Sequence, residues 1–112
     1  MNEALSFENT EPLRESTIQR FEYTFELSWK LMSSILNDQG LPTAGVRNVL
    51  RAAGQLGLVD DVVRWLEFAD ARNQTSHMYK EEVALEVYNT ARAGFVEHVD
   101  SLLNCARNYL GS

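Results

Sequence analysis

The chain has 112 residues, which is the size of one ordinary domain, so residues 1–112 are expected to form a single domain around one hydrophobic core. Hydrophobic residues make up 45% and charged residues 23% of the chain, which is typical of a folded globular protein and not of a disordered one. Ten basic and sixteen acidic residues give a net charge of -6, which argues against a DNA-binding protein because the average surface repels phosphate.

Cysteine content and hydropathy exclude further classes of protein. Cys105 is the only cysteine, so an internal disulfide and a cysteine-rich zinc site are both excluded, and no metal ion or cofactor is predicted. No apolar stretch is long enough to span a membrane, and residues 1–11 lack the basic and apolar regions of an export signal. The sequence therefore predicts a cytoplasmic protein that does not contact a membrane.

Helical periodicity dominates the first part of the chain. Between residues 13 and 36 the apolar side chains recur every three or four positions, which predicts one long amphipathic helix. Gly40 follows at the place where a left-handed helix C-terminus favours glycine. Thr43 is then expected to cap a short second helix that fades at Gly54 and Gly57.

Two further helices are predicted in the second half of the chain. The third helix begins at an N-cap that is either Asp60 or Asp61 and runs to about residue 73. Residues 74–79 are polar and lack helical periodicity, which predicts a turn, and a last long helix is expected from Glu81 onward with a bend near Gly94. The expected inward face of the third helix consists of Val62, Val63, Trp65, Leu66 and Ala69.

Strand signals are almost absent, since no alternating run of β-branched residues lies between hairpin turns. The predicted fold is therefore all-α, an up-and-down bundle of four or five helices. An aromatic stripe at helical spacing, formed by Phe21, Phe25 and Trp29, is expected in the core or in a dimer interface.

One short segment concentrates polar residues beside a break in periodicity. Arg72, Asn73, His77 and Tyr79 all fall around the predicted turn. In a continuous helix Arg72 and His77 would point about 140° apart, so a shared site requires the helix to end between them. A guanidinium group binds phosphate and an imidazole group transfers protons near neutral pH, and RNA cleavage without a metal ion needs both.

A structural role accounts for the same residue types. Arg72 would then offset the dipole at the C-terminus of a helix, and His77 would hydrogen-bond backbone carbonyl groups of the turn. The residues by themselves leave both interpretations open.

Two motifs taken together resemble a known family. The segment from Arg72 to Tyr79 resembles the Arg-x4-His-x-Tyr signature of HEPN domains, and the segment from Ile18 to Lys30 resembles the long-helix signature of the same group. The motifs stand in the family's order, and the resemblance covers roughly residues 13–109. More narrowly, the chain is similar to the branch called nucleotidyltransferase substrate-binding proteins.

The resemblance implies a helical homodimer in which the Arg and His of both subunits face a shared cleft. It also implies an endoribonuclease toxin that is encoded beside a nucleotidyltransferase antitoxin, with RNA as the substrate. On this basis the catalytic residues are His77 as general acid or base, Arg72 as phosphate clamp and Asn73 as a positioning residue. Tyr79 matches the tyrosine that the antitoxin modifies with AMP, which would add negative charge beside the cleft and block RNA.

The chain also departs from the family's pattern. Family chains usually begin with a longer first helix, whereas here only residues 1 to about 7 precede a predicted turn at residues 8–12, so the first helix is expected to be truncated. Lys80 stands where relatives often carry a capping Asn or Asp, and it either loosens the start of the last helix or adds a cation near the phosphate path. A two-fold dimer would offset the acidic net charge locally, because two copies of Arg72 and His77 share one groove.

Glu26 is the remaining candidate site residue. It precedes Lys30 by four positions, which is the favoured order for a stabilising ion pair on a helix surface. Glu26 is also a candidate for orienting Arg72 in the cleft. A paired-carboxylate active site is not predicted, because no second carboxylate stands in a fitting position.

Three functions are consistent with these features. The first is a metal-independent endoribonuclease toxin, which the set of Arg72, His77 and Tyr79 favours. The second is a non-catalytic subunit that presents substrate or nucleotide to a separate transferase, which the similarity to the substrate-binding branch favours. The third is a purely structural helical dimer, which leaves the polar turn without a purpose.

Overall fold

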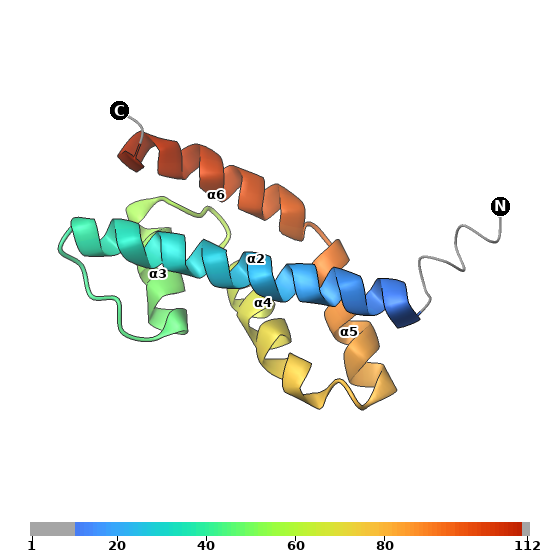
Figure 1. Cartoon of the computed structure of the whole chain (residues 1–112). Helices are drawn as coiled ribbons and strands as arrows, with labels where there is room; N and C mark the ends of the chain where they lie inside the picture. Colours follow the sequence, from blue (N-terminus) through green and yellow to red (C-terminus); the bar gives the residue numbers. More distant parts are fainter. Residues whose placement is uncertain (1–10, 111–112) are drawn as a thin grey trace.

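The computed structural model describes residues 11–110, and the prediction of a truncated first helix concerns residues outside that range. The longest element is helix α2, Glu11–Asp38, which runs along the length of the molecule (Figure 1). Its predicted end is confirmed, because Gly40 has a φ of 75° and its N–H donates to the Asn37 carbonyl at 3.0 Å. The N–H of Leu41 donates to the Leu36 carbonyl at 2.9 Å, which completes a Schellman motif.

Helix α3, Val46–Leu56, corrects one prediction about capping. Thr43 does not cap it, because the N-cap is Gly45, with a φ of 87° and no side-chain hydrogen bond. Thr43 lies two residues before that cap, which is too early for its hydroxyl group to occupy the capping position. The helix ends at Gly57, whose φ of 91° is the left-handed conformation that glycine adopts at low cost.

Helix α4, Val62–Gln74, begins as predicted at Asp61, whose carboxylate accepts a hydrogen bond of 3.1 Å from the backbone N–H of Arg64. Its inward face is partly different from the prediction. Val63 is 68% exposed, whereas Trp65 and Phe68 are fully buried. Val63 and Trp65 are two positions apart, which is about 200° around a helix, so they point to opposite sides.

The predicted last helix is two helices. α5, Glu81–Arg92, and α6, Phe95–Leu110, are separated at Ala93 and Gly94, and Gly94 has a φ of 85°. The left-handed glycine ends the helical path, and the Arg64 guanidinium donates a hydrogen bond to the freed carbonyl of Ala93. The expected bend near Gly94 is therefore a full break.

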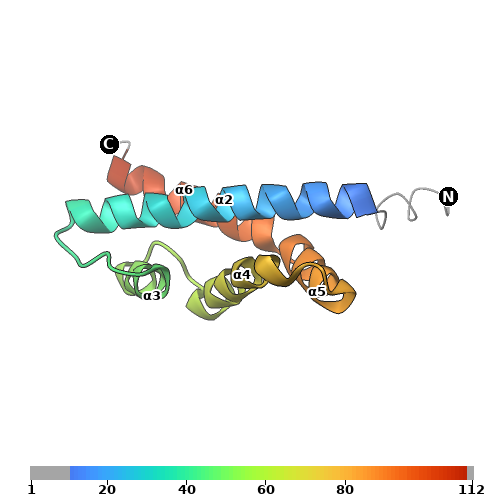
Figure 2. The ribbon, with the colours of Figure 1, turned by 60° about the horizontal axis from the view of Figure 1, so that its bottom comes forward.

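The all-α architecture is confirmed, since residues 11–110 form five α-helices and the short 3-10 helix η1, Thr75–His77, with no strand among them. Figure 2 shows α2 and α6 in one layer and α3, α4 and α5 in the other. An aromatic cluster fills the space between the layers: the rings of Phe68 and Phe95 are 4.9 Å apart and those of Phe21 and Phe95 are 4.8 Å apart. The predicted stripe on α2 is therefore core at Phe21 and Phe25 and half-buried at Trp29.

Candidate functional site

The candidate site lies where α4 turns into α5. α4 ends at Gln74 and passes directly into η1, so the helix end that the sequence analysis required between Arg72 and His77 is present. The Thr75 hydroxyl donates to the Arg72 carbonyl at 2.7 Å, and the Lys80 N–H donates to the His77 carbonyl at 3.1 Å. These bonds pair backbone carbonyls that the end of a helix leaves without partners, and they hold the turn in one shape.

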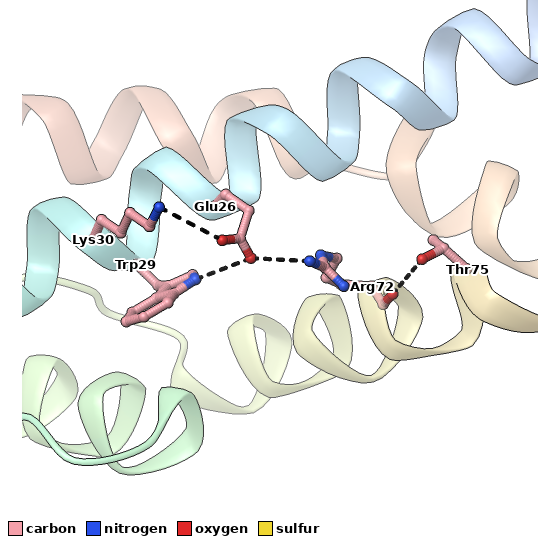
Figure 3. Close-up of polar contacts among 5 residues, drawn as sticks. All are labelled: Glu26, Trp29, Lys30, Arg72 and Thr75. Carbon is pink, nitrogen blue, oxygen red and sulfur yellow. Dashed lines mark hydrogen bonds and ion pairs between the residues drawn. The ribbon is translucent and has the colours of Figure 1, made fainter.

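Arg72 points from α4 across to the long helix α2. Figure 3 shows its guanidinium group facing Glu26, and the distance from Arg72 Nη2 to Glu26 Oε1 is 3.2 Å. The two side chains are 36% and 34% exposed, so the pair lies partly shielded from water. The structure thus brings Glu26 to Arg72 over 46 positions of sequence, as the orienting role of Glu26 requires.

Glu26 is itself held by two neighbours on α2. The indole Nε1 of Trp29 donates to Glu26 Oε1 at 3.3 Å, and the ammonium group of Lys30 lies 4.0 Å from Glu26 Oε2 (Figure 3). The predicted pair between Glu26 and Lys30 is therefore present. With three donors around it, the Glu26 carboxylate has a defined position from which to orient the guanidinium group.

Only some of the hydrogen-bond donors of the Arg72 side chain have a partner in this arrangement. Its Nη2 bonds to Glu26, but its Nε is buried and has no hydrogen-bond partner among the described residues. A guanidinium group that offers Nε and Nη2 together is shaped to bind two oxygens of a carboxylate or a phosphate. Arg72 therefore has one donor, Nε, that Glu26 does not use, and a ligand would reach that atom only if the side chain turned from its present position.

His77 and Tyr79 lie on the outer side of the same turn. His77 is exposed, Tyr79 is 79% exposed, and their ring centres are 6.2 Å apart with an interplanar angle of 66°. The Lys80 ammonium group lies 5.9 Å from the centre of the Tyr79 ring. Exposed imidazole and phenol groups at this distance can meet the same bound molecule.

The predicted site residues thus fall into two sets within one corner of the fold. Arg72 and Glu26 form the partly buried set, whereas Asn73, His77 and Tyr79 form the exposed one. No hydrogen bond or ion pair joins Arg72 to His77, although the structure describes both. A phosphate bound by both residues would therefore have to bridge them.

A pocket of about 300 Å³ adjoins the inner side of the turn, between the start of α2 and the start of α5. Thr75 and Met78 contribute to its wall from the turn, and Arg14 pairs with Glu81 at 2.8 Å across its mouth. The remaining lining includes Glu15 and further polar groups of α2. The carboxylates of Glu15, Glu22 and Glu81 make this pocket unfavourable for an anionic ligand.

Sequence reasoning missed two contributors to the site. Trp29 was expected only as a core or interface residue, yet its indole N–H bonds to Glu26. Its half-apolar, half-polar character was the available signal, because a tryptophan N–H at the edge of a core needs a partner. Thr75 was expected only as a turn residue, and its hydroxyl fixes the last turn of α4 beneath Arg72.

Two other classes of site, metal centres and membrane-spanning helices, concern residues 11–110. No group of three or more histidine, cysteine, aspartate or glutamate side chains is arranged to hold a metal ion there. In the same range, every helix is too short or too polar to cross a bilayer.

Comparison with known proteins places the chain in a family. Residues 1–107 match the family described as nucleotidyltransferase substrate binding protein like. A relative from Haemophilus influenzae, named probable ribonuclease HepT, is 40% identical over 76 residues, which are 63% of this chain and 52% of the relative. The chain therefore spans about half the length of the curated relative that it matches.

Two solved structures share the fold. A crystal structure of a protein from Thermus thermophilus has a TM-score of 0.76 and 31% identity, and the match covers 88% of this chain and 84% of that one. HI0074 from Haemophilus influenzae, described as the fold of a substrate binding domain of a nucleotidyltransferase, has a TM-score of 0.75 and 33% identity over 87% and 75% of the two chains. The resemblance found in the sequence is confirmed, and the chain belongs to the nucleotidyltransferase substrate-binding protein family.

Proposed function

We propose that this chain is an endoribonuclease toxin that acts through Arg72 and His77 and is controlled by a nucleotidyltransferase antitoxin. The observation that carries the proposal is the end of α4, where a partly exposed guanidinium group oriented by Glu26 is followed within five residues by an exposed imidazole group. The name of the Haemophilus influenzae relative, probable ribonuclease HepT, supports the same activity.

The proposed reaction needs no metal ion. His77 takes the proton of the RNA 2'-hydroxyl group, whose oxygen then bonds to the adjacent phosphorus. The bond from phosphorus to the 5'-oxygen breaks, and that oxygen takes up a proton, so the products carry a 2',3'-cyclic phosphate and a 5'-hydroxyl group. Arg72 binds the non-bridging oxygens as negative charge gathers on them. Glu26 orients Arg72, and Asn73 positions the substrate.

Expression of the chain without its partner tests this activity directly. Growth arrest together with new 2',3'-cyclic phosphate ends in cellular RNA is expected, because nothing then blocks the site. Healthy cells with unchanged RNA ends, in the presence of folded protein, would contradict the nuclease activity. That result would support the second candidate function, a non-catalytic subunit that presents substrate to a transferase, which the description of HI0074 favours.

A homodimer is part of the proposal. Cleavage uses one proton acceptor and one proton donor, and a two-fold axis beside the turn would supply His77 twice while doubling the positive charge of Arg72. We expect sedimentation equilibrium at micromolar concentration to give twice the chain mass of 12.7 kDa. A single species with the mass of one chain would contradict the shared cleft.

Tyr79 is proposed as the residue that the antitoxin modifies with AMP. Tyr79 is 79% exposed, so a second enzyme can reach it. We expect Tyr79→Phe to remain toxic when the antitoxin is co-expressed, because no phenolic oxygen is available for transfer. Growth assays with the co-expressed pair measure this, and mass spectrometry of the pair should find AMP on residue 79 of the wild type only.

Tyr23→Phe is the matched control for this experiment. Tyr23 is 69% exposed but lies on α2 rather than in the turn, so its loss should leave the modification intact. Neutralisation of Tyr79→Phe by the antitoxin, or an adduct on another residue, would contradict the assignment of Tyr79.

A further inference from the structure

Lys80 lies in the same turn as His77 and Tyr79, but the proposed nuclease reaction assigns it no role. Its backbone is fixed on both sides, because its N–H donates to the His77 carbonyl at 3.1 Å and its carbonyl accepts from the Ala84 N–H at 3.0 Å. Within residues 11–110 no carboxylate forms an ion pair with its ammonium group. The side chain instead lies toward the Tyr79 ring, with the ammonium 5.9 Å from the ring centre.

The Tyr79 ring therefore has both a cation and His77 near it. The His77 ring centre is 6.2 Å from that of Tyr79, which is close to the distance of the Lys80 ammonium. A phosphorus atom bonded to the phenolic oxygen of Tyr79 would stay within one covalent bond of that oxygen. Both distances are measured to the ring centre, and the flexible lysine side chain can turn from the ring toward a phosphate on that oxygen.

The next residues of the chain are unfavourable for a phosphate. Glu81 and Glu82 form the first turn of α5, and both are exposed. Glu81 is paired with Arg14, whereas no ion pair involves Glu82 in the described range. An anion on Tyr79 would be repelled by these carboxylates and attracted by the Lys80 ammonium group, which lies 5.9 Å from the ring centre.

We propose that Lys80 binds the phosphodiester that nucleotide transfer leaves on Tyr79 and holds the nucleotide over His77. The proposal rests on the proposed modification of Tyr79 and adds how the inhibited state is held. In the transfer, the Tyr79 oxygen bonds to the α-phosphorus of ATP supplied with the antitoxin. The bond from that phosphorus to the bridging oxygen breaks, pyrophosphate leaves with the electron pair, and the phenolic proton passes to solvent.

Holding the phosphodiester has a consequence for inhibition. A nucleotide that is free to swing on an exposed tyrosine would uncover His77 for part of the time. A charge-assisted contact with Lys80 keeps the phosphate beside the imidazole group and so keeps RNA out. Lys80 is thus a positioning residue for the inhibited state rather than a catalytic residue.

Removal of the nucleotide by a phosphodiesterase tests this contact. Wild type, Lys80→Gln and Lys80→Arg are each modified by the antitoxin with ATP, and mass spectrometry measures the fraction that carries AMP. Snake-venom phosphodiesterase is then added, and the rate of AMP release is followed. We expect release from Lys80→Gln to be about two- to fivefold faster than from wild type, the range of an exposed ion pair.

Two comparisons separate the contact from a general effect of charge or folding. Lys80→Arg should release AMP at the wild-type rate, because it keeps the positive charge. Arg51→Gln removes one positive charge on α3, which lies at the other end of the molecule from the turn (Figure 1), and should also behave as wild type. Thermal unfolding of each unmodified variant shows whether the turn is intact.

The outcomes distinguish this proposal from the one on which it rests. If none of the proteins acquires AMP, the modification of Tyr79 is wrong and the role of Lys80 is lost with it. If all acquire AMP and release it at equal rates, the modification stands and the role of Lys80 is overturned. Faster release from Lys80→Gln alone supports the contact.

Discussion

His77→Ala should abolish RNA cleavage while leaving the fold intact. Loss of a group that transfers a proton in the rate-limiting step lowers a rate by about 100- to 10000-fold. His77 is exposed, and its ring contacts only the exposed Tyr79 among the aromatic residues of the described chain, so its removal costs little packing. Sequencing of RNA ends after expression without the antitoxin measures the loss.

His98→Ala is the matched control, because His98 is the chain's other histidine and lies on α6. Its ring packs on Phe68 at 5.6 Å, so a small loss of stability is expected without loss of cleavage. Equal numbers of 2',3'-cyclic phosphate ends in cells expressing wild type and His77→Ala would exclude His77 as the acid or base. Circular dichroism of both variants separates a catalytic defect from unfolding.

Phe68→Ala should destabilise the protein more than any change at the turn. Phe68 is fully buried, and its ring makes edge contacts with Trp65 at 5.4 Å and with Phe95 at 4.9 Å. Removing a buried phenylalanine ring lowers the free energy of unfolding by about 3–5 kcal/mol, through lost burial and the cavity that remains. Because a domain of this size has about 5–15 kcal/mol in total, much of its stability would be lost.

Urea unfolding at a fixed protein concentration measures this effect, and a neighbouring residue provides the control. Val63→Ala lies on the same helix, but Val63 is 68% exposed, so its unfolding free energy should change by less than about 0.5 kcal/mol. Phe68→Leu keeps most of the apolar volume and should fall between the two. Similar midpoints for Phe68→Ala and Val63→Ala would contradict the position of the aromatic cluster.

Most helix boundaries could be predicted because they depend on local chemistry. Gly40 and Asp61 act on backbone groups a few residues away, so their roles as helix end and helix cap can be recognised without knowing the fold. The predicted cap at Thr43 is wrong because the helix begins two residues later, at Gly45, whose positive φ of 87° suits glycine. The break at Gly94 was expected only as a bend, because a helix with one glycine can either continue or stop.

Packing directions were harder to predict than boundaries. Val63 and Trp65 are both apolar, and hydrophobicity alone does not decide which of two opposite faces turns inward. Contacts with the other helices determine which face is buried. Trp65 and Phe68 pack against the aromatic rings of α2 and α6, which fill the space between the layers. The size and shape of those rings select the buried face of α4.

The candidate site likewise combines features that follow from local sequence with one contact that depends on helix packing. Helical periodicity and its interruption were enough to predict an all-α chain with a polar turn after residue 73. Arg72, His77 and Tyr79 could be assigned to one corner of the fold because they are neighbours in the chain. The sequence offered Glu26 as a candidate for orienting Arg72, but the contact itself depends on how the aromatic core packs α2 against α4. The bond from Trp29 to Glu26 lies within α2, three positions apart. Local hydrogen bonds act over a few residues and can be recognised in sequence, whereas an ion pair over 46 positions exists only once the core has placed both helices.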